Sequence, residues 1–501
     1  MKLNTKRTVF VGFAFFLICV FWQAYDAIIP KILTDKFGMA QSVSGAVMAL
    51  DNVLALFLLP LFGGLSDKVN TRFGKRTPFV LVGTVLAVAA LFLLSRADAM
   101  QTKKLEAVNT LDRVALEELY DADLTVSLSD EAGKVKLSDE ILREDFLAIT
   151  SLEDENYTKY VVPARQAYAA RVRQADPSAL ILFVSVLLVL LVAMGTFRSP
   201  AVALMPDVTP KPLRSKANAI INLMGAVGGI LVLALGVVFG TGKKANALMG
   251  FGGYFGVVGG IMLLALVLFL LLVREKKWAA EAKDLPDEAA EPVASTPKHG
   301  LSRAERRSLL LILASSVLWF MGYNAVTSKY SVYAGQVLGL DFNTTLTLAS
   351  AAAIVSYIPV GAIASRIGRK KCILAGIVML AVAFGSAAFI REGTPIWIVN
   401  IFFVLAGMGW ATINVNSYPM VVELSRDSDI GRYTGFYYTA TMTAQTVTPI
   451  LSGALMDIRF TLLFPYATVF VAASFLTMLF VKHGDNKPTA KGGVEAFDAM
   501  E

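Results

Sequence analysis

The sequence predicts an all-α membrane protein with twelve transmembrane helices in two pseudo-symmetric bundles of six. Three observations carry this prediction. Hydrophobic residues make up 55% of the 501 residues, charged residues only 17%, and the mean hydropathy is +0.60; a soluble protein cannot bury so much apolar surface behind so few charges. The apolar residues form runs of about 20 or more, the length that crosses a bilayer. Two polar loop motifs also recur at corresponding places in the two halves.

The apolar runs divide equally between the halves. In the first half they cover residues 9–30, 42–65, 77–95, 179–206, 215–240 and 250–273. In the second half they cover residues 308–330, 344–365, 372–390, 396–420, 432–456 and 461–481. We therefore expect six-helix bundles at 1–273 and 308–482, a flexible polar linker at 274–307, and a tail at 483–501.

The loop charges predict the orientation. Alternate loops on the side of the N-terminus contain 27 Lys and Arg residues, whereas the short loops on the other side contain about 8. Positive charge concentrates in cytoplasmic loops, so both termini are expected in the cytoplasm. This bias explains the pI of 9.1 without a nucleic-acid partner. The short N-terminus and the lack of a long sorting tail favour a bacterial inner membrane.

One segment interrupts the pattern of spans. Residues 97–178 form an insertion between the third and fourth runs, with 10 basic and 17 acidic residues and hence a net charge of −7. It mixes apolar and charged residues, which predicts a small folded subdomain with helical pieces on the extracytoplasmic face. It could be a simple loop expansion, a lid, a delivery site, or a docking site for an unknown partner.

Several classes of function are excluded by composition. The chain has only two cysteines and two histidines, so neither a disulfide framework nor a metal-binding cluster is expected. No nucleophile–histidine pair or phosphate-binding loop is present, which argues against an enzyme. We expect no cofactor beyond a coupling ion, and a monomer embedded in the lipid bilayer.

The repeated loop motifs predict a cytoplasmic gate. "GGLSDKVNTRFGKRTPF" (Gly63–Phe79) corresponds to "GAIASRIGRKKCIL" (Gly361–Leu374), and 198–218 corresponds to 416–435. Carboxylates and guanidiniums at helix ends can form strong paired bonds. Bonds made in one state and broken in the other bias a conformational equilibrium; the alternative is simple anchoring by positive charge. The expected gate residues are Gly64, Asp67, Arg72, Gly74, Arg76, Asp207, Arg214, Arg366, Arg369, Glu423 and Arg432.

At these motifs the chain resembles the major facilitator superfamily. The longer spacing in "SDKVNTRFGKRTPF" is similar to the glycoside–pentoside–hexuronide:cation symporters, and "MALDN", "RSKAN" and "YYTATMTAQTVTPILSG" are similar to the sucrose and maltose proton symporters. The resemblance implies two bundles that rock around a central site and move a sugar together with a cation. The sequence departs from the sodium-dependent melibiose-type pattern, because the second span has one acid, Asp51, rather than a cluster, and the eleventh has no lysine. The resemblance therefore favours a proton over sodium.

Ionisable residues inside a span are functional candidates because they are costly there. Trp22 and Asp26 lie four residues apart on one face of the first span, next to Tyr25. A carboxylate can bind sugar hydroxyls while an aromatic ring packs on the sugar, or it can carry the coupling proton. Asp26 and Asp51 are the candidates for both roles. The alternative for Asp51 is a structural pair with Asn52.

Polar and aromatic residues in other spans complete the expected sugar site. The candidate ligands are Asn52, Tyr323, Asn324, Trp410, Asn414 and Gln445, each of which could instead serve packing between helices. Lys329 is expected to extend to the membrane interface. Arg198 could pair with a carboxylate of the first half or reach the cytoplasmic surface.

The leading hypothesis is a proton-coupled symporter for an oligosaccharide or glycoside. A proton/drug antiporter of the same superfamily is the first alternative, although the Gly-Pro motif frequent in the fifth span of such antiporters is absent. A transporter-like nutrient sensor that uses the insertion is the second.

Overall fold

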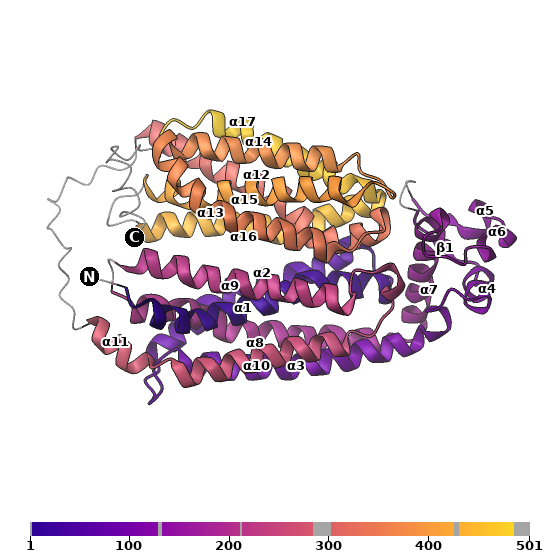
Figure 1. The fold of residues 1–501 in the computed structure, drawn as a ribbon, viewed down its shortest axis with the longest axis horizontal. Coiled ribbons are helices and arrows are strands. Elements are labelled where there is room, and N and C mark those ends of the chain that lie inside the picture. Colours follow the sequence, from indigo (N-terminus) through magenta and orange to yellow (C-terminus); the bar gives the residue numbers. More distant parts are fainter. Residues whose placement is uncertain (1–2, 129–132, 211–212, 284–301, 425–429, 485–501) are drawn as a thin grey trace.

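Long helices in two bundles dominate the structure, a computed structural model that describes residues 3–128, 133–210, 213–283, 302–424 and 430–484 (Figure 1). The first bundle contains α1 (Thr5–Lys31), α2 (Gln41–Lys68), α3 (Thr77–Lys104), α8 (Ser178–Val208), α9 (Arg214–Phe239) and α10 (Gly252–Leu272). The second contains α12 (Arg303–Tyr333), α13 (Phe342–Ile367), α14 (Arg369–Ala387), α15 (Ile396–Val422), α16 (Ile430–Ile458) and α17 (Leu463–Leu479). Short 3₁₀ turns, η5 (Lys244–Asn246) and η7 (Phe460–Leu462), precede α10 and α17.

The first helices of the two bundles end in the same way. α1 continues into a π-helical turn, η1 (Ile32–Lys36), and α12 continues into η6 (Ala334–Leu338). The first helix of each bundle therefore ends in the same local structure, as expected for two halves that repeat one fold. This local structure also gives a common reference for the depth of residues along α1 and α12.

Ten helices within the described part of the chain are long and apolar enough to cross a membrane. α13 and α16 coincide with the two remaining predicted runs. Both contain many Thr, Ser and Tyr residues, and both pack against the other bundle, α13 on α9 and α16 on α2. Helices that face protein rather than lipid can carry more polar side chains.

The insertion forms a small subdomain at one end of the bundles (Figure 1). α3 continues past the predicted end of its span to Lys104. The subdomain then contains η2 (Glu106–Val108), α4 (Arg113–Asp121), the antiparallel strands β1 (Thr125–Val126) and β2 (Val135–Lys136), α5 (Leu137–Glu140), α6 (Arg143–Leu147), η3 (Tyr157–Val161) and α7 (Val162–Ala175). Its apolar side chains form their own core, separate from that of the bundles. Below, this end of the molecule is called the insertion end.

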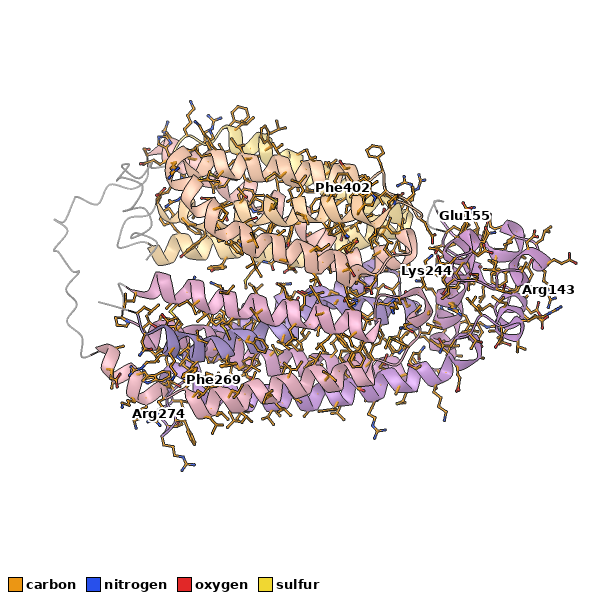
Figure 2. The ribbon with its side chains drawn as sticks, in the orientation of Figure 1. Arg143, Glu155, Lys244, Phe269, Arg274 and Phe402 are labelled. Atoms are coloured by element: carbon orange, nitrogen blue, oxygen red, sulfur yellow. The ribbon has the colours of Figure 1, made fainter. Side chains whose placement is uncertain are left out.

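Part of the segment expected to be a flexible linker is helical. α11 (Glu275–Lys283) lies at the opposite end from the insertion and packs on α8. Figure 2 shows Arg274, just before α11, at that end of the first bundle. Trp278 is buried there, and the Arg7 guanidinium lies 5.3 Å from its ring centre. The amphipathic pattern of "EKKWAAEAK" is the signal that the prediction of flexibility overlooked.

Contacts between the bundles gather at the insertion end. Gly45 of α2 lies so close to α16 that an added Cβ would fall 1.9 Å from the Pro449 carbonyl oxygen. The Asn343 amide donates to the Thr241 hydroxyl at 3.0 Å, which joins the start of α13 to the end of α9. The two bundles are therefore closed against each other at this end.

Candidate functional site

The middle of α1 presents an aromatic pair with unused hydrogen-bond donors. The rings of Trp22 and Tyr25 pack edge to face, with centroids 5.3 Å apart. The Trp22 Nε1 and Tyr25 Oη atoms are buried, and neither has a hydrogen-bond partner in the described part of the chain. A buried donor left unpaired costs about 1–3 kcal/mol. A ligand or water that supplies acceptors here would remove that cost.

Two carboxylates and a guanidinium lie beside this pair. Asp51 accepts a 2.7 Å hydrogen bond from Asn52, the structural pairing that the sequence left open. Arg198 of α8 lies over the Trp22 ring, 5.1 Å from its centre, and interacts electrostatically with Asp26 and Asp51. Of the two alternatives for Arg198, a position beside the carboxylates of the first half, over Trp22, is the one that the structure shows. Asp26 is exposed, and a membrane carboxylate of this kind faces the protein interior or a water-filled space rather than lipid.

The second bundle offers a matching aromatic group. The rings of Tyr323 on α12 and Trp410 on α15 stack in parallel, 3.7 Å apart and inclined by 4°. Phe320 packs against the edge of Trp410 at 5.1 Å. The Asn324 Nδ2 atom is buried and, among the described residues, has no hydrogen-bond partner. This group thus combines a flat apolar surface with an unused donor.

The two groups lie at corresponding depths. Trp22 precedes the end of α1 at Lys31 by nine residues, and Asn324 precedes the end of α12 at Tyr333 by nine. At 1.5 Å per residue, both lie about 14 Å from the π-helical turns. No hydrogen bond or ring contact joins the two groups within the described chain, so the fold aligns them without bringing them together.

The remaining predicted ligands fall into two classes. Asn52 uses one N–H of its amide to hold Asp51, so it supports the site. Asn414 is exposed, Gln445 is half-buried, and within the described chain neither side chain makes a hydrogen bond. Both amides are therefore available to a ligand.

Arg76 organises the predicted gate of the first bundle. Its guanidinium binds Asp67 at 2.5 Å and Asp207 at 2.8 Å, and it also reaches the Ser66 hydroxyl. Burial alone would lower the pKa of Arg76, but the bonds to Asp207 and Asp67 outweigh it and raise this pKa above its usual value. These three groups lock the ends of α2, α3 and α8 together within one bundle.

A carboxylate from α11 caps α3 at the same place. Glu275 accepts hydrogen bonds from the backbone N–H groups of Lys75, Arg76 and Thr77 at 2.6, 2.9 and 2.8 Å. Its charge also interacts favourably with the positive end of the helix dipole. Gly74, at φ +121°, leaves the space: a Cβ there would fall 2.3 Å from the Glu275 carboxyl carbon. Sequence reasoning missed Glu275 because it lies in the segment predicted as linker.

The other predicted gate residues are less connected. Arg369 pairs with Glu423 inside the second bundle. Arg72 is exposed and stacks on its neighbour Phe73, with the guanidinium carbon 4.7 Å from the ring centre, while Gly64 and Arg366 are exposed. The side chains of Arg214 and Arg432 lie outside the described residues. The ion pairs described at this end thus act within each bundle.

The expectation for Lys329 is wrong. Its side chain is fully buried, and Nζ donates a 2.6 Å hydrogen bond to the Gln41 carbonyl oxygen of the other bundle. Asp457, at the end of α16, accepts from the backbone N–H groups of Gln41 and Ser42 at 2.5 and 2.8 Å. The start of α2 is therefore held from the second bundle by a cation and an anion. Charges at the ends of the seventh and eleventh spans were the available signal.

The insertion adds contacts to both bundles at the closed end. Gln166 of α7 donates to Asp35 at 3.0 Å, and Gln336 of η6 donates to the same oxygen at 3.2 Å. Glu392, between α14 and α15, accepts from Thr158 of the insertion and pairs with Lys244, which Figure 2 shows at this junction. The three parts of the molecule are thus bonded together there.

Comparisons with known proteins identify the fold family. The family model described as "Major Facilitator Superfamily" matches residues 168–355 and 342–498, and the one described as "MFS/sugar transport protein" matches residues 10–106. A crystallised D-xylose-proton symporter matches with a TM-score of 0.57 at 15% identity, covering 96% of this chain and 99% of that one. The inward-open xylose transporter XylE from E. coli matches with a TM-score of 0.54 at 13% identity, covering 98% of each chain.

Curated relatives match over shorter stretches. The "Putative glycoside/cation symporter YagG" of Escherichia coli (strain K12) is 34% identical over 64 residues, 13% of this chain and 14% of that protein. The "Uncharacterized MFS-type transporter MJ1317" of Methanocaldococcus jannaschii is 28% identical over 125 residues, 25% of this chain and 30% of that protein. The matched regions thus span less than a third of each relative. With the superfamily model covering most of the sequence, the chain belongs to the major facilitator superfamily and is a multi-pass membrane transporter rather than an enzyme.

Proposed function

We propose that this transporter carries a sugar, an oligosaccharide or glycoside, together with a proton. One observation supports this above the others: aromatic surfaces and unused buried donors occur at corresponding depths in both bundles. Trp22 and Tyr25 contribute them on one side, and Tyr323, Asn324 and Trp410 on the other. A sugar ring has an apolar face that packs on aromatic rings and a rim of hydroxyls that can satisfy such donors.

The charged cluster beside Trp22 supports cation coupling. Asp26 and Asp51 together carry one more negative charge than Arg198 can balance. Closing a site around an unbalanced charge is costly, so a cation that binds with the sugar favours closure. The proton remains the favoured cation because the apolar part of α2 has one acid, Asp51, and α16 has no lysine, unlike the sodium-dependent melibiose-type symporters. A likeness to the sucrose and maltose symporters stays a prediction.

The proposed topology follows from the loop charges. All twelve long helices, α13 and α16 included, cross a bacterial inner membrane, with both termini in the cytoplasm and the insertion outside. The bundles are taken as 1–273 and 308–482, joined through 274–307, with α12 beginning at Arg303 inside the connecting segment. The molecule works as a monomer without a cofactor beyond the coupling ion. In this frame the structure is inward-facing, since the bundles are bonded together at the insertion end.

The transport cycle then has four steps. The protein opens at the insertion end and takes up a proton at the carboxylate cluster. The sugar binds between the aromatic groups of the two bundles and pairs their free donors. The neutralised site allows the insertion end to close, where Asp457 and Lys329 engage the start of α2. Sugar and proton leave on the side of α11, and the empty protein returns.

A pH electrode tests the proposal directly. De-energised cells that express the protein receive xylose, sucrose, maltose, melibiose or raffinose at low sodium. Alkalinisation with one sugar supports proton symport; sugar entry only after sodium is supplied would change the ion. Silence under both conditions would overturn the sugar assignment and favour drug antiport or sensing.

Two variants sharpen this experiment. Asp26→Asn should abolish accumulation of the active sugar against a gradient, and normal accumulation would remove Asp26 as the coupling site. Trp22→Phe keeps the ring but removes the free Nε1 donor, so it should weaken sugar binding about five-fold to 100-fold, the value of roughly 1–3 kcal/mol for one hydrogen bond. Trp397→Phe is the matched control, because Trp397 is an exposed ring outside the proposed site.

A further inference from the structure

A cleft of about 700 Å³ lies at the insertion end, where the insertion meets both bundles. The first bundle lines it with Thr34 and residues 38–41, and the second bundle lines it with residues 456–460. The insertion supplies the remaining wall from the segment around β1 and from α7. The size of the cleft is within the range of small-molecule sites, and none of the residues proposed to bind sugar lines it.

Three cations line this cleft without a carboxylate partner in the described part of the chain. Lys134 of the insertion and Arg459 of the second bundle make no ion pair or side-chain hydrogen bond there. Arg171 of α7 donates at 2.9 Å to a backbone carbonyl, that of Ala122, rather than to an acid. An ammonium and two guanidinium groups, from two separate parts of the molecule, are therefore available to a ligand.

The two acids that line the cleft are already engaged. Asp123 pairs with Lys136 at 3.1 Å, and the Asp457 carboxylate accepts the backbone N–H groups at the start of α2. A cleft lined by one sign of charge concentrates ions of the opposite sign. The cleft thus favours an anion, although the insertion as a whole has a net charge of −7.

A buried amide adds a second requirement for the ligand. Gln41 is 2% exposed and lines the cleft, and its Oε1 atom has no hydrogen-bond partner among the described residues. Its Nε2 atom donates to the Thr34 hydroxyl at 3.2 Å, which orients the amide. A buried acceptor left unpaired is costly, and a ligand hydroxyl can donate to it. An anion that carries hydroxyl groups therefore fits better than a bare anion or a neutral sugar.

The cleft is complete only while the insertion end is closed. The insertion is packed tightly on the first bundle, because a Cβ added at Gly38, where φ is +56°, would fall 2.3 Å from the Gln166 carbonyl oxygen of α7. The wall at 456–460 belongs to the second bundle and separates from the others when this end opens. A ligand that bridges these walls binds the closed state more tightly and shifts the equilibrium toward it.

We propose that this cleft is an extracytoplasmic effector site for a sugar acid, a small anion with hydroxyl groups, and that the bound anion holds the insertion end closed. Arg171, Lys134 and Arg459 bind its carboxylate, and Gln41 accepts one of its hydroxyls. Uptake requires this end to open, so an occupied cleft slows uptake. Binding does not depend on which substrate is transported; the side from which the anion arrives rests on the proposed topology.

Calorimetric titration of the purified full-length protein tests binding without transport. The probes are glucuronate, glucose, which lacks the carboxylate, and acetate, which lacks the hydroxyls. Glucuronate should bind roughly ten-fold more tightly than either, because each of the others loses at least one hydrogen bond. Absence of glucuronate binding would overturn the site. Equal binding of glucose would overturn the role of the cations, and equal binding of acetate would overturn that of Gln41.

Variants assign the binding to the cleft. Arg459→Gln should weaken glucuronate binding roughly ten-fold to 100-fold, the value of one hydrogen bond to a charged group, with an unchanged melting temperature of the free protein. Arg391→Gln is the matched control, because Arg391 is exposed at the same end and donates to carbonyls of its own loop. Trp22→Phe should also leave the affinity unchanged. A loss with Trp22→Phe but not with Arg459→Gln would place the anion in the sugar site and overturn the proposal.

A cysteine reporter tests the effect on conformation. Ser44 is buried at the closed insertion end and does not line the cleft, so Ser44→Cys, without the two native cysteines, reacts with an impermeant maleimide only when this end opens. Glucuronate at about 100 times its Kd should slow the reaction about 100-fold if the open form does not bind it, and far less with Arg459→Gln. An unchanged rate with glucuronate bound would overturn the effector role. Both measurements remain decisive even if no sugar is transported with a proton.

Discussion

The carboxylate of Asp457 is expected to hold the insertion end closed. It reaches from α16 to the start of α2 and accepts two backbone N–H groups, at 2.5 and 2.8 Å. The N-cap residue of α2, Ala40, provides no side-chain cap of its own. The first turn of α2 therefore depends on a group from the other bundle, and this contact exists only while the bundles are together.

The size of the effect follows from these bonds. Asp457→Asn keeps one acceptor oxygen but loses the second bond and the charge near the helix dipole. A hydrogen bond to a charged group contributes about 1.5–3 kcal/mol. Asp457 is exposed to solvent, and screening reduces the net loss to about 1–2 kcal/mol. The population open at the insertion end should rise roughly five-fold to thirty-fold.

Labelling of Ser44→Cys with an impermeant maleimide, in a background where Cys19 and Cys372 are replaced by serine, measures this population. Asp139→Asn is the matched control, since Asp139 is exposed in the insertion and away from the bundle interface. The labelling rate should rise with Asp457→Asn and stay unchanged with the control. An unchanged rate in Asp457→Asn, with the reporter still reactive on unfolded protein, would refute the role of this cap.

Three further outcomes are expected. Gly45→Leu should trap the protein open at the insertion end, because a Cβ there would meet the Pro449 carbonyl; uptake should stop while sugar binding persists, and Ala46→Leu, at an exposed neighbour, should keep uptake. Glu275→Gln should lower the melting temperature by several degrees in a thermal-shift assay, because charge-assisted bonds to α3 are lost. Glu281→Gln, in a half-exposed pair with Arg7, should have less effect. Hydrogen bonds from Lys104 and Ser178 lower the pKa of Asp176, at the base of the insertion, to about 2. The ionised Asp176 therefore stabilises the insertion fully above about pH 4, and this stabilisation should be lost as the pH falls through about 2. Faster acid proteolysis of the insertion would measure the loss.

The pairing of Arg76 with Asp67 and Asp207 illustrates a site that sequence could indicate but not complete. The repeated loop motifs placed these three residues at helix ends on one side of the membrane, and the structure joins them. Glu275 was not foreseen, because the cap on α3 comes from a helix far along the chain. Which groups meet across such a distance depends on how the helices pack.

The membrane fold can be predicted from the amino-acid sequence, because hydropathy over about 20 residues is a local property that any span must satisfy. The sequence also identified Asp26, Asp51 and Arg198, because charges stand out in apolar runs. The three-dimensional packing was needed to show that Asp51 pairs with Asn52, that Arg198 lies over Trp22, and that Lys329 is buried against Gln41. These outcomes depend on the rotation of each helix about its axis and on which ends of the bundles meet. Many side chains from both halves set those quantities together, and no local pattern records them.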